Sequence, residues 1–389
     1  MELDLKKLSY KLNKDEYLNY IHSLKSDPLI ISFNINKKDY FFNYLIEIQK
    51  ENILINKSQV ELDMLFNSFD EFIKNQIIKE LIIDEIKQTN EIENIITTHK
   101  DLYSSLEKIK TRKNNKKLST IIEGYKYLLT NKITIKNNQD IKSIYDKVFI
   151  SSISKKDYPD GKYYRNNMVF ISNGLETIHK GDLNESEIIK DMETFFKIYN
   201  SSDIDTYIKC FISHFIFETI HPYYDCNGRF GRLLMSIKIK EELESITSLL
   251  ISSSINKNKS KYYKLLESSR NAFQHGFLNN YVYNMLKITN EEINKKIKEY
   301  SNKFEYLKRK IIEINNSTSY SKGNKKIMIL LLKASLFTQY GLTNDELAEY
   351  TKLNKRTIIL FINKLIKENK IINTNIGRYT FHNLINDFK

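Results

Sequence analysis

The stretch His221-Pro-Tyr-Tyr-Asp-Cys-Asn-Gly-Arg-Phe-Gly-Arg232 decides how the sequence is interpreted. Pro222, one of only three prolines in 389 residues, biases His221 toward an extended conformation, so the apolar helical run before it is expected to end there. Asn227-Gly228 suits a tight turn or the start of a helix. The stretch therefore predicts a bend between two helices.

A helix that resumes near Arg229 would place Arg229 and Arg232, three residues apart, on one face. Bare N–H groups at such a helix start, flanked by two guanidiniums, form a receptor for a polyphosphate. Asp225 could hold a divalent cation against those phosphates, because hard cations prefer carboxylate oxygen. The imidazole of His221 is then free to take a proton from an incoming hydroxyl.

This segment resembles the signature of the Fic (Fido-fold) family, His-Pro-Phe-x-Asp-Gly-Asn-Gly-Arg-x-x-Arg. The resemblance implies a mainly helical Fic/Fido core with a β-hairpin flap, and transfer of AMP from ATP to a protein hydroxyl with Mg²⁺ as cofactor. It makes His221 the general base, Asp225 the magnesium ligand and Asn227 a contact to the α-phosphate. The β- and γ-phosphates would lie on the two arginines, within a nucleotide site formed by Asp225, Cys226, Asn227, Gly228, Arg229, Gly231 and Arg232.

Two positions depart from the family pattern. Tyr223 in place of Phe is a mild change, whereas Cys226 stands where the family usually has Gly. If that position needs a positive φ, a Cβ there costs energy; if it only lends its N–H, Cys serves nearly as well.

A second motif precedes the signature, in a helical segment expected at about residues 75–97. The apolar spacing predicts one helical face, with a turn or a new helix near Thr89. The run Thr89-Asn-Glu-Ile-Glu93-Asn94 resembles the family's inhibitory motif, Ser/Thr-x-x-x-Glu-Gly/Asn, which implies that Glu93 pairs with Arg232. An arginine held by a carboxylate is unavailable to a γ-phosphate, so ATP would bind poorly. The alternative is a helix cap followed by a solvated acid.

Residues 168–179 carry a hairpin signal, with Asn173-Gly174 between two short apolar runs. The family has a flap at this place, and the resemblance implies that a target protein binds along it by strand addition. The alternative is a hairpin with no function.

The run at 204–220 predicts a buried helix. His214 within it could form part of a metal pair, but a packed core histidine is favoured, and Glu218 is interpreted as structural. Further on, the helical run that contains Tyr262 and Tyr263 resembles the segment that lines the family's nucleotide site, which implies that one of these tyrosines contacts the adenine or the ribose. Tyr263 is assigned there, with core aromatics at helical spacing as the alternative.

The chain is expected to divide into an N-terminal helical region (1–110), a Fic/Fido catalytic domain (111–300), a helical connector with a linker (301–322) and a C-terminal module (323–389). Residues 29–35 favour a strand, whereas the following run FFNYLIEI has spacing closer to helix.

The C-terminal module has the pattern of a winged helix-turn-helix. A helix at 325–336 is followed by a capping box, Thr343-Asn-Asp-Glu346, a turn at 352–354, a helix at 355–369 and two strands bent around Gly377. Residues 323–389 hold eleven Lys/Arg against five Asp/Glu, an excess of six within a net charge of +13. DNA is therefore a possible partner, with protein binding or dimer packing as the alternatives.

Composition sets the remaining limits. Forty-one per cent hydrophobic and 28% charged residues are typical of a globular protein, and two cysteines are too few for a disulfide framework. The sequence has no signal-peptide core or membrane span, so we expect a cytoplasmic protein, with a second copy of the chain as one candidate partner. The sequence predicts a protein adenylyltransferase inhibited by Thr89, Glu93 and Asn94. The alternatives are an enzyme that removes AMP or transfers another phosphate-containing group, and a DNA-binding regulator whose Fic-like part senses nucleotide.

Overall fold

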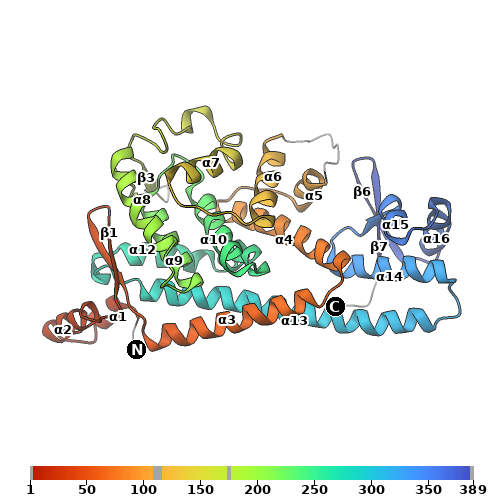
Figure 1. Cartoon of the computed structure of the whole chain (residues 1–389), viewed down its shortest axis with the longest axis horizontal. Coiled ribbons are helices and arrows are strands. Elements are labelled where there is room, and N and C mark those ends of the chain that lie inside the picture. Colours follow the sequence, from red (N-terminus) through yellow and green to blue (C-terminus); the bar gives the residue numbers. More distant parts are fainter. Residues whose placement is uncertain (1–2, 108–115, 173–176, 386–389) are drawn as a thin grey trace. The chain divides into compact units, whose positions relative to one another are not determined.

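The apolar runs of the sequence form mainly helices. The structure, a computed structural model, describes residues 3–107, 116–172 and 177–385, and these hold sixteen α-helices and seven strands (Figure 1). The chain divides into two compact units. The first comprises Met1–Val60, Gln88–Ile96 and Glu123–Ile293; the second comprises Glu61–Lys87, Thr97–Ile122 and Asn294–Lys389. No helix among the described residues is both long and apolar enough to cross a membrane.

The N-terminal part of the first unit contains two short helices and a hairpin, α1 (Leu5–Ser9), α2 (Lys14–Lys25), β1 (Ile31–Ile35) and β2 (Lys38–Phe42). The predicted strand at 29–35 is confirmed as β1. The helical interpretation of the following run is wrong at its beginning, because Phe41 and Phe42 end β2 instead. Both rings are buried, and the N–H of Phe41 donates to the carbonyl of Gly276 at 2.9 Å. That partner lies far away in sequence, so local spacing did not indicate it.

Four helices contain residues of both units: α3 (Ile46–Asn67), α4 (Glu71–Ile92), α6 (Lys116–Thr130) and α13 (Asn279–Asn316). The turn expected near Thr89 is absent, since α4 runs unbroken to Ile92. Thr89 is 1% exposed and its hydroxyl accepts a hydrogen bond from Arg232, so a long-range contact occupies the position that looked like a cap.

The core of the first unit is the helix pair α9 (Thr206–Ile220) and α10 (Asn227–Leu243), drawn in green in Figure 1. Every residue of α9 from Tyr207 onward is buried, as expected for a helix that is apolar all round. Asn184 caps the neighbouring helix. The helices around the pair are α6 (Lys116–Thr130, shared with the second unit), α7 (Asn138–Val148), α8 (Glu185–Tyr199), α11 (Ile251–Lys257) and α12 (Lys259–Arg270).

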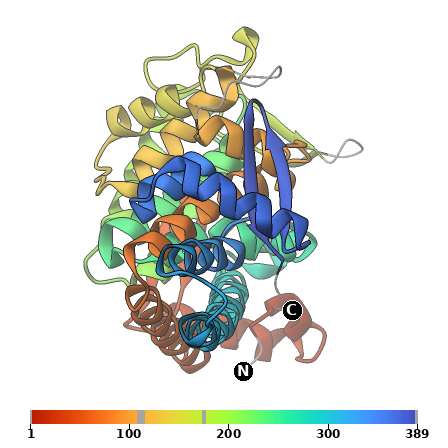
Figure 2. The ribbon, with the colours of Figure 1, turned by 90° about the vertical axis from the view of Figure 1, so that its right-hand side faces the viewer.

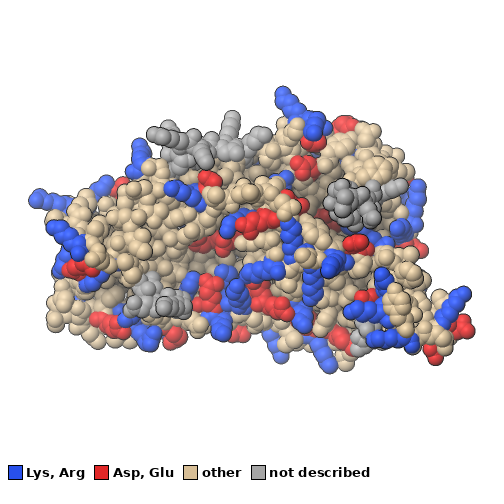
Figure 3. Space-filling view, turned by 180° about the vertical axis from the view of Figure 1, so that it is seen from behind, with Lys and Arg blue, Asp and Glu red and all other residues tan. Residues whose placement is uncertain are grey.

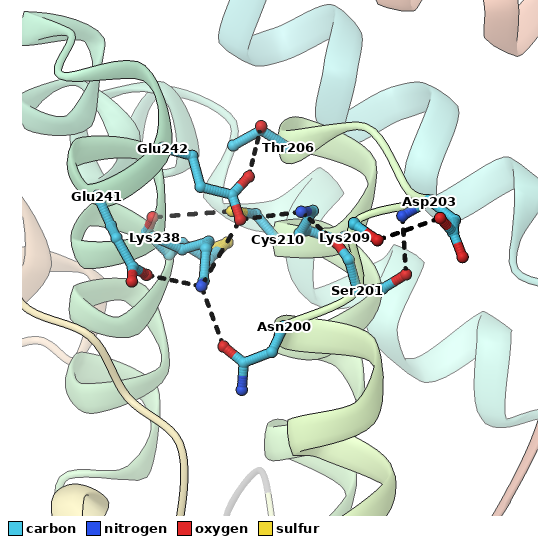
Figure 4. Close-up of polar contacts among 11 residues, drawn as sticks. Asn200, Ser201, Asp203, Thr206, Lys209, Cys210, Lys238, Glu241 and Glu242 are labelled. Atoms are coloured by element: carbon cyan, nitrogen blue, oxygen red, sulfur yellow. Dashed lines mark hydrogen bonds and ion pairs between the residues drawn. The ribbon is translucent and has the colours of Figure 1, made fainter.

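A network of buried charges holds the first turns of α9 against the last turns of α10 (Figure 4). The Lys209 ammonium donates to Glu242 at 2.9 Å and to the carbonyl of Ser201 at 2.5 Å. The Lys238 ammonium donates to Glu241 at 2.6 Å and to Asn200 at 3.2 Å. Both lysine side chains are at most 5% exposed, so these partners compensate the loss of solvation.

A second hairpin lies between α7 and α8. Its strands, β3 (Phe170–Ser172) and β4 (Thr177–Lys180), are antiparallel. A hairpin is therefore present where the sequence predicted one, although the expected turn at Asn173-Gly174 lies outside the described residues.

The C-terminal part of the second unit contains the three helices and the final pair of strands that the sequence predicted, in the predicted order. Glu346 and Thr343 form the capping box, the C-cap Lys352 has a φ of 57°, and Gly377 in the last turn has a φ of 58°. Strand β5 was not predicted; it extends the last hairpin, drawn in dark blue in Figure 2, to a sheet of order β5-β7-β6. The elements are α14 (Lys322–Phe337), β5 (Leu342–Thr343), α15 (Asn344–Thr351), α16 (Lys355–Lys367), β6 (Ile371–Ile376) and β7 (Tyr379–Leu384), after α5 (His99–Leu106) earlier in this unit.

Candidate active site

The bend between α9 and α10 begins at His221, which caps α9 in the left-handed region at φ 53° and ψ 63°. The extended conformation expected before Pro222 is therefore wrong. In the left-handed conformation the N–H of His221 still donates to Phe217 at 2.9 Å, so the helix closes its last turn before the proline ends it.

Cys226 answers the question that the sequence left open. Its φ is 68°, so the position does need the conformation that favours glycine, and the Cβ costs about 1 kcal/mol. The thiol is buried and accepts a hydrogen bond from Arg229 at 2.8 Å. Burial raises the pKa of this thiol to about 12, so it remains protonated at neutral pH.

Asn227 closes the bend. Its side-chain oxygen accepts from the N–H of Tyr223 at 2.9 Å, and its amide donates to the carbonyl of the same residue at 2.7 Å. The Tyr223 ring stacks on Tyr145 with centroids 3.6 Å apart, and the Tyr145 hydroxyl donates to the carbonyl of Asp225 at 3.0 Å. The bend is thus fixed by its own side chains and by α7.

The two arginines of the signature have different partners. Arg232, 1% exposed, donates from Nη2 to Glu93 at 2.7 Å and from Nε to Thr89 at 2.9 Å. Burial alone would lower the pKa of this guanidinium, but the Glu93 carboxylate and nearby tyrosines outweigh burial and raise the pKa. Arg229 instead lies over the Phe149 ring at 5.8 Å and 3.7 Å from Asp225. The structure thus contains the expected ion pair of Glu93 and Arg232, but among the described residues the two arginines have no common partner.

A cavity of about 440 Å³ opens beside Arg232. Six residues of the predicted site and inhibitory motif line it, namely His221, Gly228, Arg232, Tyr263, Glu93 and Asn94. Five others do not, namely Asp225, Cys226, Asn227, Arg229 and Gly231, and neither does Thr89. A Cβ at Gly228 would collide with the Glu93 carboxylate, so this glycine leaves the space that Glu93 fills. The remaining lining residues are Ile92, Glu218, Lys259, Tyr262, Leu266, Glu267 and Arg270.

Deep in the same region, His214 is a packed core residue, as favoured. It is 1% exposed, and its Nε2 lies 2.7 Å from the Tyr262 hydroxyl. Burial and the charge of Arg232 lower its pKa to about 3, so it stays neutral. Glu218 differs from its structural interpretation because it lines the cavity and its Oε1 has no hydrogen-bond partner among the described residues. Burial raises the pKa of Glu218 to about 7.

The end of α4 is held in place from α12. Lys259 donates to the Asn94 side chain at 2.7 Å and to the carbonyl of Glu91 at 3.2 Å. The Tyr263 hydroxyl, on a side chain that remains 40% exposed, lies 3.4 Å from the carbonyl of Ile92. Tyr263 thus touches both the cavity and the segment that carries Glu93.

Asp225 has the donor chemistry for a hard cation. Its side chain is 48% exposed, and one oxygen accepts from the N–H of Cys226 at 2.5 Å. No group of three or more His, Cys, Asp or Glu gathers around a common point in the described ranges. The residues therefore fit a magnesium ion that takes one protein carboxylate and completes its shell from phosphates and water.

Sequence reasoning missed Arg165. This arginine is fully buried, and its Nε donates to the carbonyl of His221 at 2.9 Å. It lies 56 residues before the bend. A lone arginine in a polar stretch carries no periodicity, so the sequence offered no signal for it.

Part of the chain is similar to known proteins. Residues 135–237 match the model of the Fic/DOC family. A Fic family protein from Desulfovibrio desulfuricans G20 has a similar fold, with a TM-score of 0.51 and 15% identity over 86% of this chain and 97% of that one. Fic-1 from C. elegans matches with a TM-score of 0.47 and 16% identity, covering 75% of this chain and 80% of its own. Members of the family commonly transfer AMP or other phosphate-containing groups. The match to the Fic/DOC family is thus confined to residues 135–237, which include the bend, all of α9 and most of α10.

Proposed function

We propose that this protein is an adenylyltransferase that transfers AMP from ATP to a hydroxyl of a target protein, and that Glu93 inhibits it. The observation that carries the proposal is one cavity lined by His221, Arg232 and Glu93, with Glu93 already bound to Arg232. A base, a phosphate-binding cation and a competing carboxylate thus meet in one place.

The proposed chemistry needs few groups. His221 accepts the proton of a Tyr, Thr or Ser hydroxyl, whose oxygen then forms a bond to the α-phosphorus as the bond to pyrophosphate breaks. Arg232 holds the terminal phosphate, and Tyr263 borders the space for the nucleoside. Magnesium, when bound through Asp225, would neutralise phosphate charge. Catalysis then rests mainly on positioning and charge compensation.

Inhibition follows from competition for one guanidinium. Arg232 makes three hydrogen bonds to Thr89 and Glu93, and the Glu93 carboxylate lies where a Cβ of Gly228 would be. A γ-phosphate that reaches Arg232 must displace this carboxylate, which costs the charge-assisted hydrogen bond and adds repulsion between anions. Removing the carboxylate is expected to raise activity.

Label transfer from α-labelled ATP tests the proposal. The Glu93→Gly variant should modify itself or a target in cell lysate roughly 10-fold faster than the parent. This factor corresponds to about 1.4 kcal/mol of competition between the Glu93 carboxylate and the γ-phosphate for Arg232. The double variant Glu93→Gly/His221→Ala should lose roughly 100-fold or more of that rate. Equal rates with and without Glu93 would remove the inhibitory role, and transfer that persists without His221 would remove the base.

A related activity at the same site is hydrolytic removal of AMP, with Glu93 orienting the attacking water. The position of Glu93 in the cavity with His221 favours it as the second candidate. Incubation of an AMP-modified protein with the parent and with Glu93→Gly separates the two. Removal that depends on Glu93 supports hydrolysis, and a screen of other nucleotides identifies transfer of a different group.

We further propose that the C-terminal module is a winged helix that binds DNA. Its order of one helix, a strand, two helices and two strands, with the sheet order β5-β7-β6, supports this. On the face drawn in Figure 3, Lys and Arg are interspersed with Asp and Glu, so the net positive charge forms no single patch there. The first turn of α16 exposes Lys355, Arg356 and Thr357, in the place where such a module reaches phosphates and base edges.

Fluorescence anisotropy with a labelled DNA duplex tests this surface. Arg356→Glu should weaken binding roughly 10-fold and reduce the dependence of affinity on salt, because one phosphate contact is lost. Lys326→Glu, at the start of α14, is a charge-matched control. If both variants bind alike, α16 is not the DNA surface and the module has another partner.

A further inference from the structure

Arg165 joins three segments of the first unit that are far apart in sequence. Its side chain is fully buried, and every hydrogen bond it makes goes to a backbone carbonyl. Nε donates to His221 at 2.9 Å, and Nη2 donates to Ile220 at 3.3 Å. The guanidinium therefore holds the carbonyls on either side of the point where α9 ends.

The other arm of the guanidinium reaches the hairpin β3–β4. Nη1 donates to Asn167 at 2.6 Å, three residues before β3, and to Asp182 at 2.8 Å, two residues after β4. One nitrogen thus ties the two ends of the hairpin together, while the neighbouring nitrogens of the same rigid plane hold the bend. A planar fork fixes the distance between its partners, which a flexible ammonium cannot do.

Backbone contacts run alongside this link. The N–H of Asp182 donates to Ile220 at 3.2 Å, and the N–H of Arg165 donates to Pro222 at 3.2 Å. Gly181 lies against the guanidinium, and a Cβ built there would come within 2.5 Å of Nη2. The chain is therefore shaped to admit the arginine between the hairpin and the bend.

We propose that Arg165 is a positioning residue, which sets the hairpin β3–β4 at a fixed place relative to His221 and so aligns a segment bound along the hairpin with the base. This inference rests on the proposed function, since it needs an acceptor hydroxyl beside the hairpin. Arg165 itself does not line the cavity that holds Arg232 and Glu93. Its loss should therefore impair transfer far more than nucleotide binding.

The variants Arg165→Lys and Gly181→Ala test the inference in the Glu93→Gly background. Arg165→Lys keeps the positive charge but loses the planar guanidinium. Gly181→Ala keeps Arg165 but places a methyl group against its guanidinium. Lys162→Met is the matched control, because it removes an exposed cation from the same segment. A displacement of about 1 Å can cost roughly 100-fold in rate, so both test variants should lose about that much in label transfer at saturating ATP. Affinity for a non-hydrolysable ATP analogue should change less than about 3-fold.

Hydrogen exchange separates this inference from the proposed function. Without nucleotide, the amides of Gly181 and Asp182 should exchange at least about 10-fold faster in both test variants than in the control, because their backbone bonds depend on the seated guanidinium. Added guanidinium should restore transfer to Arg165→Ala if that variant folds. Unchanged exchange, or transfer and nucleotide affinity that fall together, would overturn the inference. If the Glu93→Gly parent transfers no label, the proposed function fails, while exchange still decides whether Arg165 couples hairpin and bend.

Discussion

The two ends of the helix pair α9–α10 differ in whether their buried charged side chains have hydrogen-bond partners. At the end shown in Figure 4, Lys209 and Lys238 are buried, and each has a carboxylate and a neutral oxygen as partners. At the end with the bend, Glu218 Oε1 and Arg229 Nε are buried without a hydrogen-bond partner among the described residues. The same two helices thus carry a satisfied polar network and an unsatisfied one.

The difference teaches where to look for chemistry in this domain. A satisfied network stabilises the helix pair and offers nothing to a ligand. Buried groups that lack partners cost free energy, and folded proteins retain them mostly where function needs them. The left-handed φ of His221 and Cys226 adds strain at the same end. Strain, unpaired groups and the cavity coincide at the bend.

The largest expected effect on stability is at the end of the helix pair that contains Lys209 and Lys238. Lys209→Met should lower the free energy of unfolding by about 3 kcal/mol, because it leaves the carbonyl of Ser201 and the partly exposed carboxylate of Glu242 without the donor that they share. Urea denaturation measures the loss. The double variant Lys209→Met/Glu242→Gln should recover part of it, and nucleotide affinity should stay unchanged in both. A single variant as stable as the parent would break the comparison, since this network would then contribute nothing.

At the bend, Glu218→Gln should change how stability depends on pH. The pKa of Glu218 is raised from 4.5 to about 7, so the folded protein keeps a proton that the unfolded chain has lost, and stability falls as pH rises through this window. The variant should lose less unfolding free energy between pH 5 and pH 8, by on the order of 1–3 kcal/mol. Burial also raises the pKa of Asp182 to about 7, so part of the slope should remain. Identical slopes in variant and parent would contradict the assignment.

The smallest effect should come from strain alone. Cys226→Gly should raise the free energy of unfolding by about 0.5–1 kcal/mol, because glycine adopts a φ of 68° without steric cost. Cys226→Ser keeps the Cβ and should gain nothing. Thermal unfolding of the three proteins decides the matter. A Cys226→Gly protein less stable than the parent would mean that the buried thiol and its bond from Arg229 outweigh the strain.

Much of the fold followed from local pattern. The buried helix α9 and the capping box of α15 depend on nearby residues, and both were predicted correctly. The ion pair of Glu93 and Arg232 followed from a family resemblance rather than from spacing. The Fic signature also located the bend.

What the sequence did not predict depends on distant partners. Phe41 forms a strand because it pairs with backbone near Phe277, and α4 continues through Thr89 because Arg232 binds that hydroxyl. The burial of Arg165 and the pairing of Lys209 with Glu242 are likewise long-range. Periodicity reports which face of an element is buried, but not which charged side chain from elsewhere will meet it.

The position of Glu93 relative to α4 has a consequence for the kinetics of the proposed inhibition. α4 ends at Ile92, and Glu93 lies in the turn that follows, with its N–H bonded to Asn90 at 3.0 Å. The last turn of a helix opens far more readily than the helix leaves its site, and such fraying takes nanoseconds to microseconds. Thr89 can keep its hydrogen bond to Arg232 while the Glu93 carboxylate moves away. Under the inhibition proposed above, the contact between Glu93 and Arg232 can open and close many times within one catalytic turnover, so activity would be set by the fraction of time that the contact is open.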